Sequence, residues 1–535
     1  MGVFLFCFRQ TGFIVDYRDS LKVHFRIKRN RTAFYPKVTE FSKANILLLS
    51  CLDFSVMKAE LNLNQNNITM RNLQMRCWLA IIAVFIFCCT GSVQAQFQNT
   101  VVHNKDKDHY SIVTSVLDPT HSVVAETINR GTLDVHLMEI DALGSVVFER
   151  IYQTSFKERV FHITESLNGG YILCGAQDPG DGLDHGWILE VDPSFGFVNE
   201  VLFNNVISPR HTPALHISAS INDPQPGYVI TGFVATGYGN PAPKEAYVRK
   251  LDPTLGLVWE RFFNANSGQN QDWDMASHSV EVPQSGYFVG GSSTGNPAGG
   301  FCDQVVLALL LDYNGNVQWL NAVEDNPISS IGHASVGADA FYNAATHEIY
   351  QLANYSIIHH FGVNVWDVNT GALNGATSFE VFSSLGYANI AGFKILESHN
   401  PDNFLVAGYI RSASISDPVT GALIADGSFP IAAEFNKYST AVVWDYLYPV
   451  PSSNYFVSSS YFDAFSQGQQ SRIYHPKMAL RQQAGSGYEL VGPRLRAGLF
   501  ETELLELDAN GRNGCINTEI ALIPQMLNPT FHFIG

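Results

Sequence analysis

The chain has 535 residues, of which 46% are hydrophobic and 15% charged, and its formal net charge at pH 7 is −17. The hydrophobic share is that of an ordinary globular protein, and the 43 glycines, 36 phenylalanines and 22 tyrosines suit an all-β chain rich in turns. The negative charge argues against nucleic acid and anionic membrane surfaces as partners, because both are bound by basic faces.

An apolar segment with the features of an export signal occupies residues 70–95. Arg76 precedes an unbroken apolar run over residues 78–89, and Val93 and Ala95 fit the small-residue rule for cleavage. We therefore predict a signal peptide over residues 70–95, followed by a mature chain that begins with the next residue. The run is short for a transmembrane span, and a signal anchor is the alternative interpretation.

Residues 1–69 are basic and irregular and contain no copy of the repeat described below. Because a signal peptide has to be N-terminal, we interpret them as a mis-called upstream extension. Residues 1–95 hold 12 basic and 5 acidic side chains, so the rest of the chain has 20 basic and 44 acidic ones and a formal charge of −24. We expect this mature chain to be secreted, on the cell surface or periplasmic, to be a monomer, and to contain no membrane span.

From about residue 109 onward the chain repeats a unit of four short apolar strands. Its most regular landmark is an aspartate that closes the third strand, followed by a glycine turn and an apolar-aromatic fourth strand. The landmark aspartates are Asp141, Asp192, Asp252, Asp312, Asp367 and Asp508. A four-stranded repeat with a period of roughly 45 to 70 residues is typical of a β-propeller, because one four-stranded sheet cannot bury both of its faces alone.

We predict an all-β fold over residues 96–535, a single seven-bladed β-propeller of four-stranded antiparallel blades. Units five and six have the weakest pattern, and we expect any error in the blade count at their boundary. The units cover His109–Tyr152, Val160–Phe203, Ala214–Phe263, Ala276–Leu320, His333–Phe382, Ala388–Tyr448, and His475 to the INTEIALI segment before Pro524.

The second strands carry a repeated Gly-Tyr pair, as in GGYILCG, GYVITG and GYELVG. Together with the pattern Asp-x-x-x-Gly-x-Val-x-Trp, these segments are similar to the propeller repeats of secreted and surface proteins of Bacteroidota-type bacteria. The leader that ends in Val-Gln-Ala-Gln is also typical of such exports. The resemblance implies a propeller fold, but its motifs specify an architecture rather than an activity.

A histidine stands at the start of the first strand in six of the seven units. These are His109, His162, His216, His278, His333 and His475. In a propeller the first strand lines the central channel, so six imidazoles could point toward one mouth of it. Clustered imidazoles bind Zn, Cu, Ni or Fe, or act as a pH-dependent charge switch.

The alternative, which we favour, is that these histidines are structural. Propellers with tryptophan–aspartate repeats tie such a histidine to an acid of the same blade. A side chain that recurs in every blade indicates architecture, because a functional site usually breaks the symmetry of a repeat. We therefore predict hydrogen bonds within the blades, such as His162–Asp184 and His278–Asp303. The candidate acids before the third strands are Asp134, Asp184, Glu245, Asp303 and Glu501.

One glycine-rich loop places Asp178, Asp181 and Asp184 close together in the sequence. Carboxylate oxygens on such a loop suit Ca²⁺, so calcium is a candidate ligand here. The segment Asp-Pro-Gly within it is also an ordinary turn signal, which leaves a structural interpretation open. We expect no other cofactor.

The sequence contains no motif that identifies a reaction. A His-Glu-x-x-His pair is absent, and the spacing of Asp252, Gly256 and Trp259 matches the docking motifs of quinoprotein dehydrogenases only in part. We interpret the chain as an exported binding or scaffold module with a protein or glycan ligand at one face of the ring. The alternative is a propeller enzyme, either a quinoprotein-like dehydrogenase or a glycan-active enzyme.

Overall fold

The computed structural model of the protein contains two compact units, Met1–Ser92 and Val93–Gly535. In the first unit the described residues form a three-stranded antiparallel sheet of β1 (Phe4–Phe8), β2 (Thr11–Asp16) and β3 (His24–Arg26). The residues that the structure describes are 4–8, 11–16, 24–26, 98–102, 110–203, 210–235, 244–263, 274–293, 305–324, 335–355, 360–383, 386–387, 389–412, 427–448, 478–483, 487–496, 499–513, 518–519, 522–526 and 530–533.

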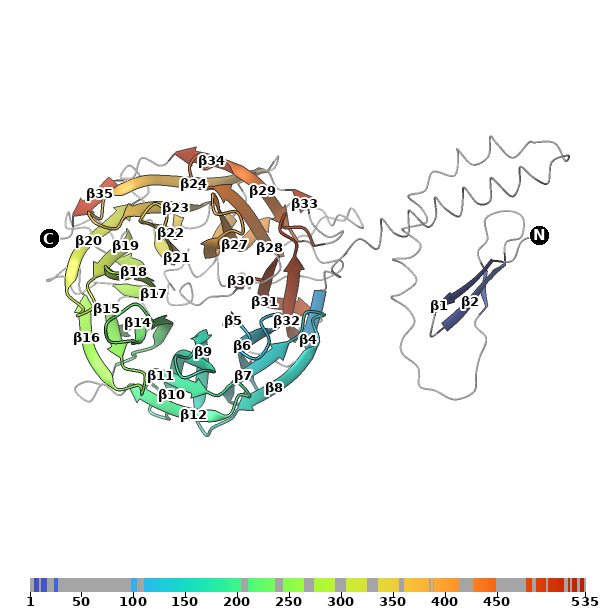
Figure 1. Ribbon diagram of the computed structural model, residues 1–535, viewed down its shortest axis with the longest axis horizontal. Coiled ribbons are helices and arrows are strands. Elements are labelled where there is room, and N and C mark those ends of the chain that lie inside the picture. Colours follow the sequence, from blue (N-terminus) through green and yellow to red (C-terminus); the bar gives the residue numbers. More distant parts are fainter. Residues whose placement is uncertain are drawn as a thin grey trace. The chain divides into compact units, whose positions relative to one another are not determined.

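The second unit is a ring of seven antiparallel four-stranded blades (Figure 1). The strands are, blade by blade and from first to fourth, β5 (Tyr110–Thr114), β6 (Ser122–Asn129), β7 (Leu133–Ile140), β8 (Val146–Tyr152); β9 (Lys157–Glu165), β10 (Tyr171–Asp178), β11 (His185–Val191), β12 (Phe197–Phe203); β13 (Ala214–Ser220), β14 (Gly227–Ala235), β15 (Lys244–Leu251), β16 (Leu257–Phe263); β17 (Met275–Val282), β18 (Gly286–Ser293), β19 (Val305–Leu311), β20 (Val317–Glu324); β21 (Val336–Asn343), β22 (Glu348–Tyr355), β23 (His360–Asp367), β24 (Leu373–Ser383); β26 (Asn389–Glu397), β27 (Asn403–Ser412), β28 (Gly427–Asn436), β29 (Val442–Leu447); and β30 (Ala479–Gln482), β31 (Tyr488–Arg496), β32 (Leu499–Leu507), β4 (Gln98–Val102).

The burial of each strand follows its place in the blade. The first strands contact one another around the whole ring and lie nearest its centre (Figure 1). The second and third strands are buried on both faces, as in β10 and β11, because each blade packs against two neighbours. The fourth strands, such as β8, are largely exposed. This is why the second and third strands read as continuous apolar runs in the sequence.

The seven blades confirm the predicted fold class and blade count, including units five and six. The predicted end of unit seven is wrong. Its fourth strand is β4, from the N-terminal side of the ring, which pairs with β32 through Thr502 and Val101. A pattern along the chain cannot show this pairing, because its two strands lie about as far apart in sequence as the domain allows.

The INTEIALI segment instead belongs to a tail that adds further strands to other blades. The short strand β33 (Thr518–Glu519) pairs with β29, β34 (Leu522–Met526) with β24, and β35 (Thr530–Phe533) with β20. A two-residue strand, β25 (Gly386–Tyr387), also pairs with the end of β24. Among the described residues no helix is long and apolar enough to cross a membrane.

The two faces of the ring differ in the length of their connections. The turns between first and second strands and between third and fourth strands share one face, here called the short-turn face, and residues 115–121 form the longest of them. The strand ends that the remaining connections join lie at the opposite face, here called the long-connection face. Its longest segments in the sequence are residues 264–274, 294–304, 325–335, 413–426 and 448–478.

Candidate functional site

Five of the first strands contain a β-bulge at the same register. In β9 the bulged residue is Phe161, since His162 pairs with Cys174 while Val160 pairs with the next residue of β10. The residues directly after the bulge form what we call the inner ring, and blades one and seven contribute the matching positions without a bulge. The inner ring consists of Ser111, His162, His216, His278, Asp339, Lys394 and Ala479.

Three inner-ring side chains fasten their blade to the next one. Each accepts a hydrogen bond from the backbone N–H that follows the inner-ring position of the next blade. Because a bulge interrupts the ladder, these side chains satisfy backbone groups beside it. The bonds are Ile163 N to Ser111 Oγ at 3.1 Å, Ser279 N to His216 Nδ1 at 3.3 Å and Ile395 N to Asp339 Oδ2 at 3.2 Å.

The other polar members of the inner ring make different contacts. The imidazole of His162 lies 4.0 Å from that of His216, centroid to centroid, and Lys394 Nζ lies 3.6 Å from Asp339 Oδ2. His278 Nδ1 pairs with the hydroxyl of Ser277 at 2.9 Å. Neither His162 Nδ1 nor His278 Nε2 has a hydrogen-bond partner among the described residues. The ring therefore combines inter-blade bonds with two buried, unpaired imidazole nitrogens.

Burial keeps these imidazoles neutral at physiological pH. It lowers the pKa of His162 and His278 to about 3, and the ammonium group of Lys394 acts in the same direction. The pKa of His216 is also lowered well below its ordinary value, by burial and by its three cationic or ionisable neighbours in the ring. Burial raises the pKa of Asp339, and Lys394 opposes part of that effect. A neutral imidazole serves as a hydrogen-bonding group here rather than as a charge.

The predicted hydrogen bond between His162 and Asp184 is wrong. Asp184 instead accepts two hydrogen bonds from Arg159 NH1, at 2.9 and 2.8 Å. The His278–Asp303 pair stays a prediction, because Asp303 lies outside the described residues. Three of the six predicted histidines lie outside them as well, namely His109, His333 and His475. Within the described part of the chain, no three His, Cys, Asp or Glu side chains gather in a way that could hold a metal ion.

The sequence analysis missed the residues that link the blades at the short-turn face. The hydroxyl of Tyr228, in blade three, lies 2.9 Å from Ser166 Oγ of blade two and accepts a 2.9 Å hydrogen bond from Leu167 N. Ser166 also donates to Glu190. The same three residue types meet at Ser115, Glu139 and Tyr171 and at Ser398, Glu434 and Tyr488.

This Ser–Glu–Tyr link explains the Gly-Tyr repeat. The tyrosine reaches back to the preceding blade, so its recurrence reflects the assembly of the ring. Its signal in the sequence was a serine just before the first turn and a glutamate two residues before the landmark aspartate, as Glu190 precedes Asp192. No rule for a single blade connects these positions, because the tyrosine belongs to the next repeat.

Blade three carries a variant of this link, with Lys250 in place of the glutamate. Lys250 Nζ donates to the hydroxyl of Tyr287 at 2.7 Å and to Asp223 Oδ2 at 3.0 Å, while Ser220 Oγ lies 2.9 Å from the same hydroxyl. Tyr287 itself donates to Asp223. Lys250 and Asp223 are both buried and form an ion pair. Asp223 therefore supplies the carboxylate that the glutamate supplies in the Ser–Glu–Tyr links.

In blades three and four, a tryptophan of the fourth strand hydrogen-bonds to the landmark turn of the next blade. Trp259 Nε1 donates to Tyr313 O at 3.1 Å, and Trp319 Nε1 donates to Val368 O at 2.8 Å. A Cβ atom on Gly371, whose φ is +68°, would lie 2.7 Å from the ring of Trp319. The partial quinoprotein-type motif is therefore an inter-blade contact in this chain.

The three aspartates predicted to bind calcium each have a donor within the protein. Asp178 Oδ1 accepts from Gly180 N and Gly182 N at 2.9 and 3.0 Å, and Asp181 Oδ2 lies 2.8 Å from His185 Nε2. Asp184 is bound by an arginine, as described above. The loop lies on the long-connection face, and calcium binding there stays a prediction.

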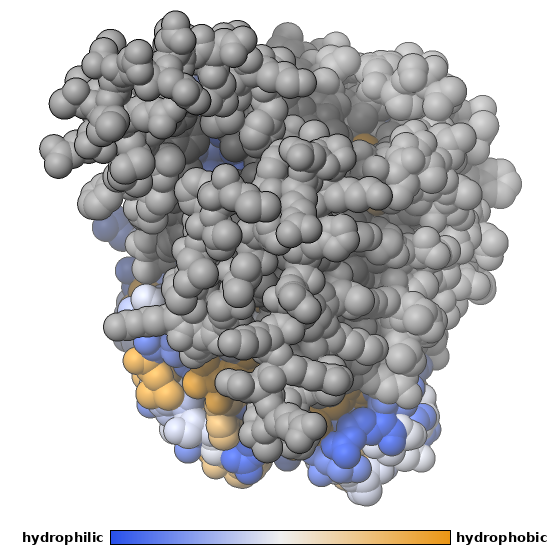
Figure 2. Space-filling view, turned by 90° about the vertical axis from the view of Figure 1, so that its right-hand side faces the viewer, coloured by the Kyte–Doolittle hydropathy of each residue, from blue (hydrophilic) through white to orange (hydrophobic). Residues whose placement is uncertain are grey.

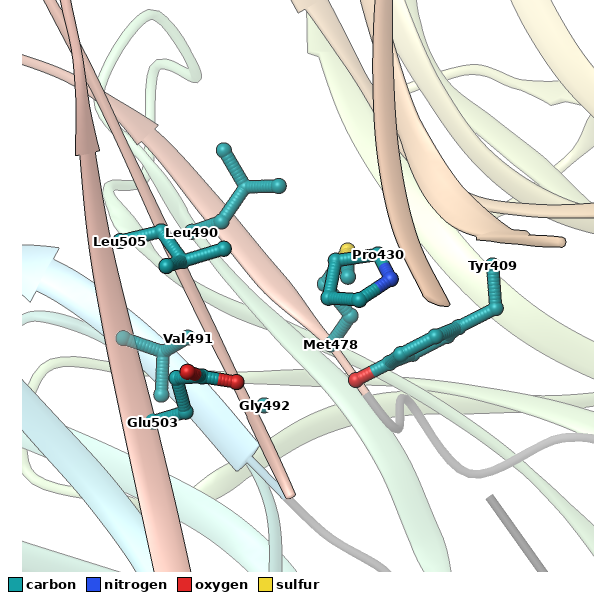
Figure 3. A pocket seen from close by; sticks show the side chains of 8 residues that line it. All are labelled: Tyr409, Pro430, Met478, Leu490, Val491, Gly492, Glu503 and Leu505. Carbon is teal, nitrogen blue, oxygen red and sulfur yellow. The ribbon is translucent and has the colours of Figure 1, made fainter. Parts of the chain in front are cut away.

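A small cavity lies between blades six and seven (Figure 3). Its volume is about 10 Å³, which is room for about one water molecule. Apolar side chains form most of its wall, and the hydroxyl of Tyr409 points into it beside Glu503. Burial raises the pKa of Tyr409, and the carboxylate of Glu503 raises it further. The cavity is too small for a glycan or a peptide side chain, so it does not define the ligand site.

The tyrosines at and just after the end of β29 are not available to stack on a ligand. Tyr446 and Tyr448 are buried, and Tyr448 donates a 2.7 Å hydrogen bond to Gly511 O of blade seven. They therefore pack between blades. The Tyr455–Phe462 segment lies outside the described residues.

No family model matches this chain, and no curated protein matches it. Among solved structures it is similar to an oligogalacturonate lyase in complex with manganese, at 9% identity and a TM-score of 0.40 over 77% of this chain and 97% of the other. It is also similar to the Dos1 propeller, at 9% identity and 0.37 over 71% and 74%, and to the WD40 domain of SCAP from fission yeast, at 9% and 0.33 over 78% and 99%. At these TM-scores the likeness carries no argument about ligand or activity.

Proposed function

We propose that this chain is an exported binding or scaffold protein whose ligand, a protein or a glycan, contacts the long-connection face of the propeller. The observation that carries the proposal is the unequal length of the connections at the two faces. Insertions in repeat folds concentrate on the face that binds, since loops tolerate length changes and carry recognition residues. The short-turn face has no comparable segment among the described residues.

The inter-blade contacts give this binding face a rigid support. The Ser–Glu–Tyr links and the tryptophan contacts use polar groups of the short-turn face to join neighbouring blades. A stiff ring holds loops at fixed positions, which lowers the entropy lost when a ligand orders them. A bonded short-turn face and long connections at the opposite face together suit recognition of a ligand.

Export is supported by where the predicted cleavage site lies relative to the ring. Cleavage after Ala95 would leave Gln98–Val102, the closing strand of blade seven, on the mature chain. A cut a few residues later would remove it. The predicted signal peptide and the start of the propeller are therefore compatible.

The proposal is tested with the form that begins at Gln96. It is screened on glycan and protein arrays, and hydrogen exchange is then measured with and without the best ligand. We expect slower exchange at residues 178–185 and beside the long connections, and no change at the landmark turns such as residues 192–196. Protection confined to the short-turn face would contradict the proposal, and release of a cleaved glycan would favour the enzyme.

A further inference from the structure

The chain's own tail shows how the outside of this ring binds an extended segment. Its strands β33, β34 and β35 lie antiparallel on the fourth strands of blades six, five and four in turn (Figure 1). In the middle contact Phe379 pairs with Pro524. Proline has no N–H to donate, so it fits a strand whose far side is open. Strand addition to the rim is therefore an interaction that this fold already uses.

Among the residues that the structure describes, no strand of the tail lies on the rim of blades one to three. Their fourth strands β8, β12 and β16 are the last strands of their sheets among the residues that the structure describes. An outermost strand presents a row of backbone N–H and C=O groups along one edge, which can pair with another extended chain. These three edges correspond in position to those that the tail covers.

Exposed apolar side chains are concentrated on the same three strands. Val147 of β8 is 54% exposed, Phe197 of β12 is 58% exposed and Leu257 of β16 is 58% exposed. Figure 2 shows apolar residues (orange) beside hydrophilic ones (blue) in the described part of the surface. An outer strand with exposed apolar side chains and an open edge is suited to pairing with another strand. The other exposed large hydrophobic residues of these strands are Phe148, Val198, Val258 and Phe262.

The charged side chains of these strands are engaged within the ring. One glutamate of each strand, Glu149, Glu200 or Glu260, bonds within its own blade to His136, Trp187 or Arg249 in turn. Proteins block outer strands with lysine or other charges that point along the edge. Here Arg150 NH1 of β8 donates to Phe195 O at 2.8 Å, and Arg261 Nε of β16 donates to Gly315 O at 3.1 Å. Both arginines reach sideways to the next blade. They strengthen the ring and leave the edge open to a further strand.

We propose that the rim of blades one to three is a docking surface for an extended segment of a partner protein. The segment adds as a fifth strand antiparallel to β8, β12 or β16, with apolar side chains at alternate positions. Because the chain's own tail already lies on blades four to six, the occupant is a segment of a different protein. Strong negative charge on that segment is disfavoured, since the mature chain carries −24. This surface is separate from the long-connection face, so the two proposals are tested independently.

A peptide with the sequence of residues 518–533 is the probe, as a stand-in for the partner segment. It is labelled and titrated with the full chain, and binding is followed by fluorescence anisotropy. We expect saturable binding that weakens at least tenfold in a variant with Phe148→Lys, Phe197→Lys and Leu257→Lys. A peptide N-methylated at alternate residues should not bind, because it cannot pair with the strand edge.

The matched control replaces equally exposed apolar residues away from the rim, with Leu117→Lys, Leu143→Lys and Ile221→Lys, which are 59%, 69% and 67% exposed. Binding should stay within twofold of the unaltered chain, and thermal melting should show both triple variants folded. Absence of binding would overturn the proposal, as would equal weakening in the two variants. The proposal would also be overturned if only Val317→Lys and Val443→Lys, on blades four and six, abolished binding. That result would mean that the peptide replaces the chain's own tail on those blades. Self-association that the rim variant removes would assign the surface to a second copy instead.

Discussion

At the scale of single residues, several polar side chains of this protein join neighbouring blades. The hydroxyl of Tyr228 joins two blades at the short-turn face, and His216 does the same near the centre of the ring. The predicted bond between His162 and Asp184 is not formed, because Asp184 bonds to Arg159 instead. The geometric reason is that a blade satisfies its own backbone by its ladder, so the unsatisfied groups lie at bulges and turns, next to the adjacent sheet.

Removing one of these hydroxyls should destabilise the ring. In Tyr228→Phe, Ser166 and Leu167 N lose a buried partner, and we expect the free energy of unfolding to fall by about 1–3 kcal/mol. Tyr438→Phe is the control, since Tyr438 is 66% exposed, and it should change stability by less than about 0.5 kcal/mol. Urea unfolding of the form that begins at Gln96 measures both. Equal effects would show that the bond contributes nothing.

The inner-ring histidines should make stability depend on pH. Their folded pKa lies near 3 for His162 and His278, whereas the unfolded pKa is about 6.5. The unfolded state therefore binds more protons between these values, so stability is full above about pH 6.5 and falls as the pH decreases. Each such histidine contributes a slope of up to about 1.4 kcal/mol per pH unit.

Urea unfolding at pH 7.5, 6.5, 5.5 and 5.0 tests this expectation. In His278→Gln one titrating group is removed while an amide remains, so the slope below pH 6.5 should be smaller than in the unaltered chain. An identical slope in the variant would show that His278 is not buried in its neutral form.

At the scale of elements, the landmark turn has two functions. Its aspartate accepts backbone hydrogen bonds that shape the turn, as Asp252 Oδ1 does from Thr254 N and Gly256 N at 2.8 and 2.9 Å. In the turns that begin at Asp312 and Asp367, a backbone carbonyl also accepts a hydrogen bond from the tryptophan of the preceding blade. The repeat conserves its spacing along the chain because one short element both closes a hairpin and docks a neighbour.

Two glycines separate these functions experimentally. Gly371 and Gly182 have φ values of +68° and +78°, but only at Gly371 would a Cβ meet another side chain, that of Trp319. Each substitution by alanine should cost about 1–2 kcal/mol for the left-handed backbone. Gly371→Ala should cost about 1–3 kcal/mol more because it overpacks the contact. Thermal unfolding compares the stability of the two variants. Equal losses of stability would mean that the tryptophan side chain moves aside without a measurable energetic penalty.

At the scale of the whole molecule, a strand that precedes the first blade and strands that follow the last one hold the ring together. The strand β4 completes blade seven, and Arg481 NH1 of that blade donates to Thr114 Oγ1 of blade one at 2.9 Å. Further along, the tail lies over the outer strands of three blades. Closure is a cooperative property, because each blade buries its two faces only when both neighbours are in place.

Deleting the closing strand should therefore weaken the entire domain. A form that begins at Asp106 lacks β4, so the outer edge of β32 loses its partner and blade seven becomes a three-stranded sheet. We expect a lower melting temperature and a broader transition than in the form that begins at Gln96. Calorimetry measures both quantities. A single transition unchanged in temperature and width would show that β4 does not close the ring.

The sequence by itself determined the class of fold, the number of blades and the positions of their turns. These features depend on local patterns, namely alternation within strands, glycine at turns and an aspartate such as Asp192 that caps a hairpin, and each pattern lies within about ten residues. Even the boundary between units five and six, where the pattern is weakest, agrees with the strands β24 and β26.

Only the tertiary structure decided which side chains meet. Asp184 bonds to Arg159 and not to His162, and the glutamate of the Ser–Glu–Tyr link becomes Lys250 in one blade because Asp223 compensates the charge. The pairing of β4 with β32 and the course of the tail likewise join residues far apart in the chain. The physical reason is that local pattern fixes which face of a strand is buried, whereas hydrogen-bond partners follow from how neighbouring sheets pack, and no single repeat contains that information.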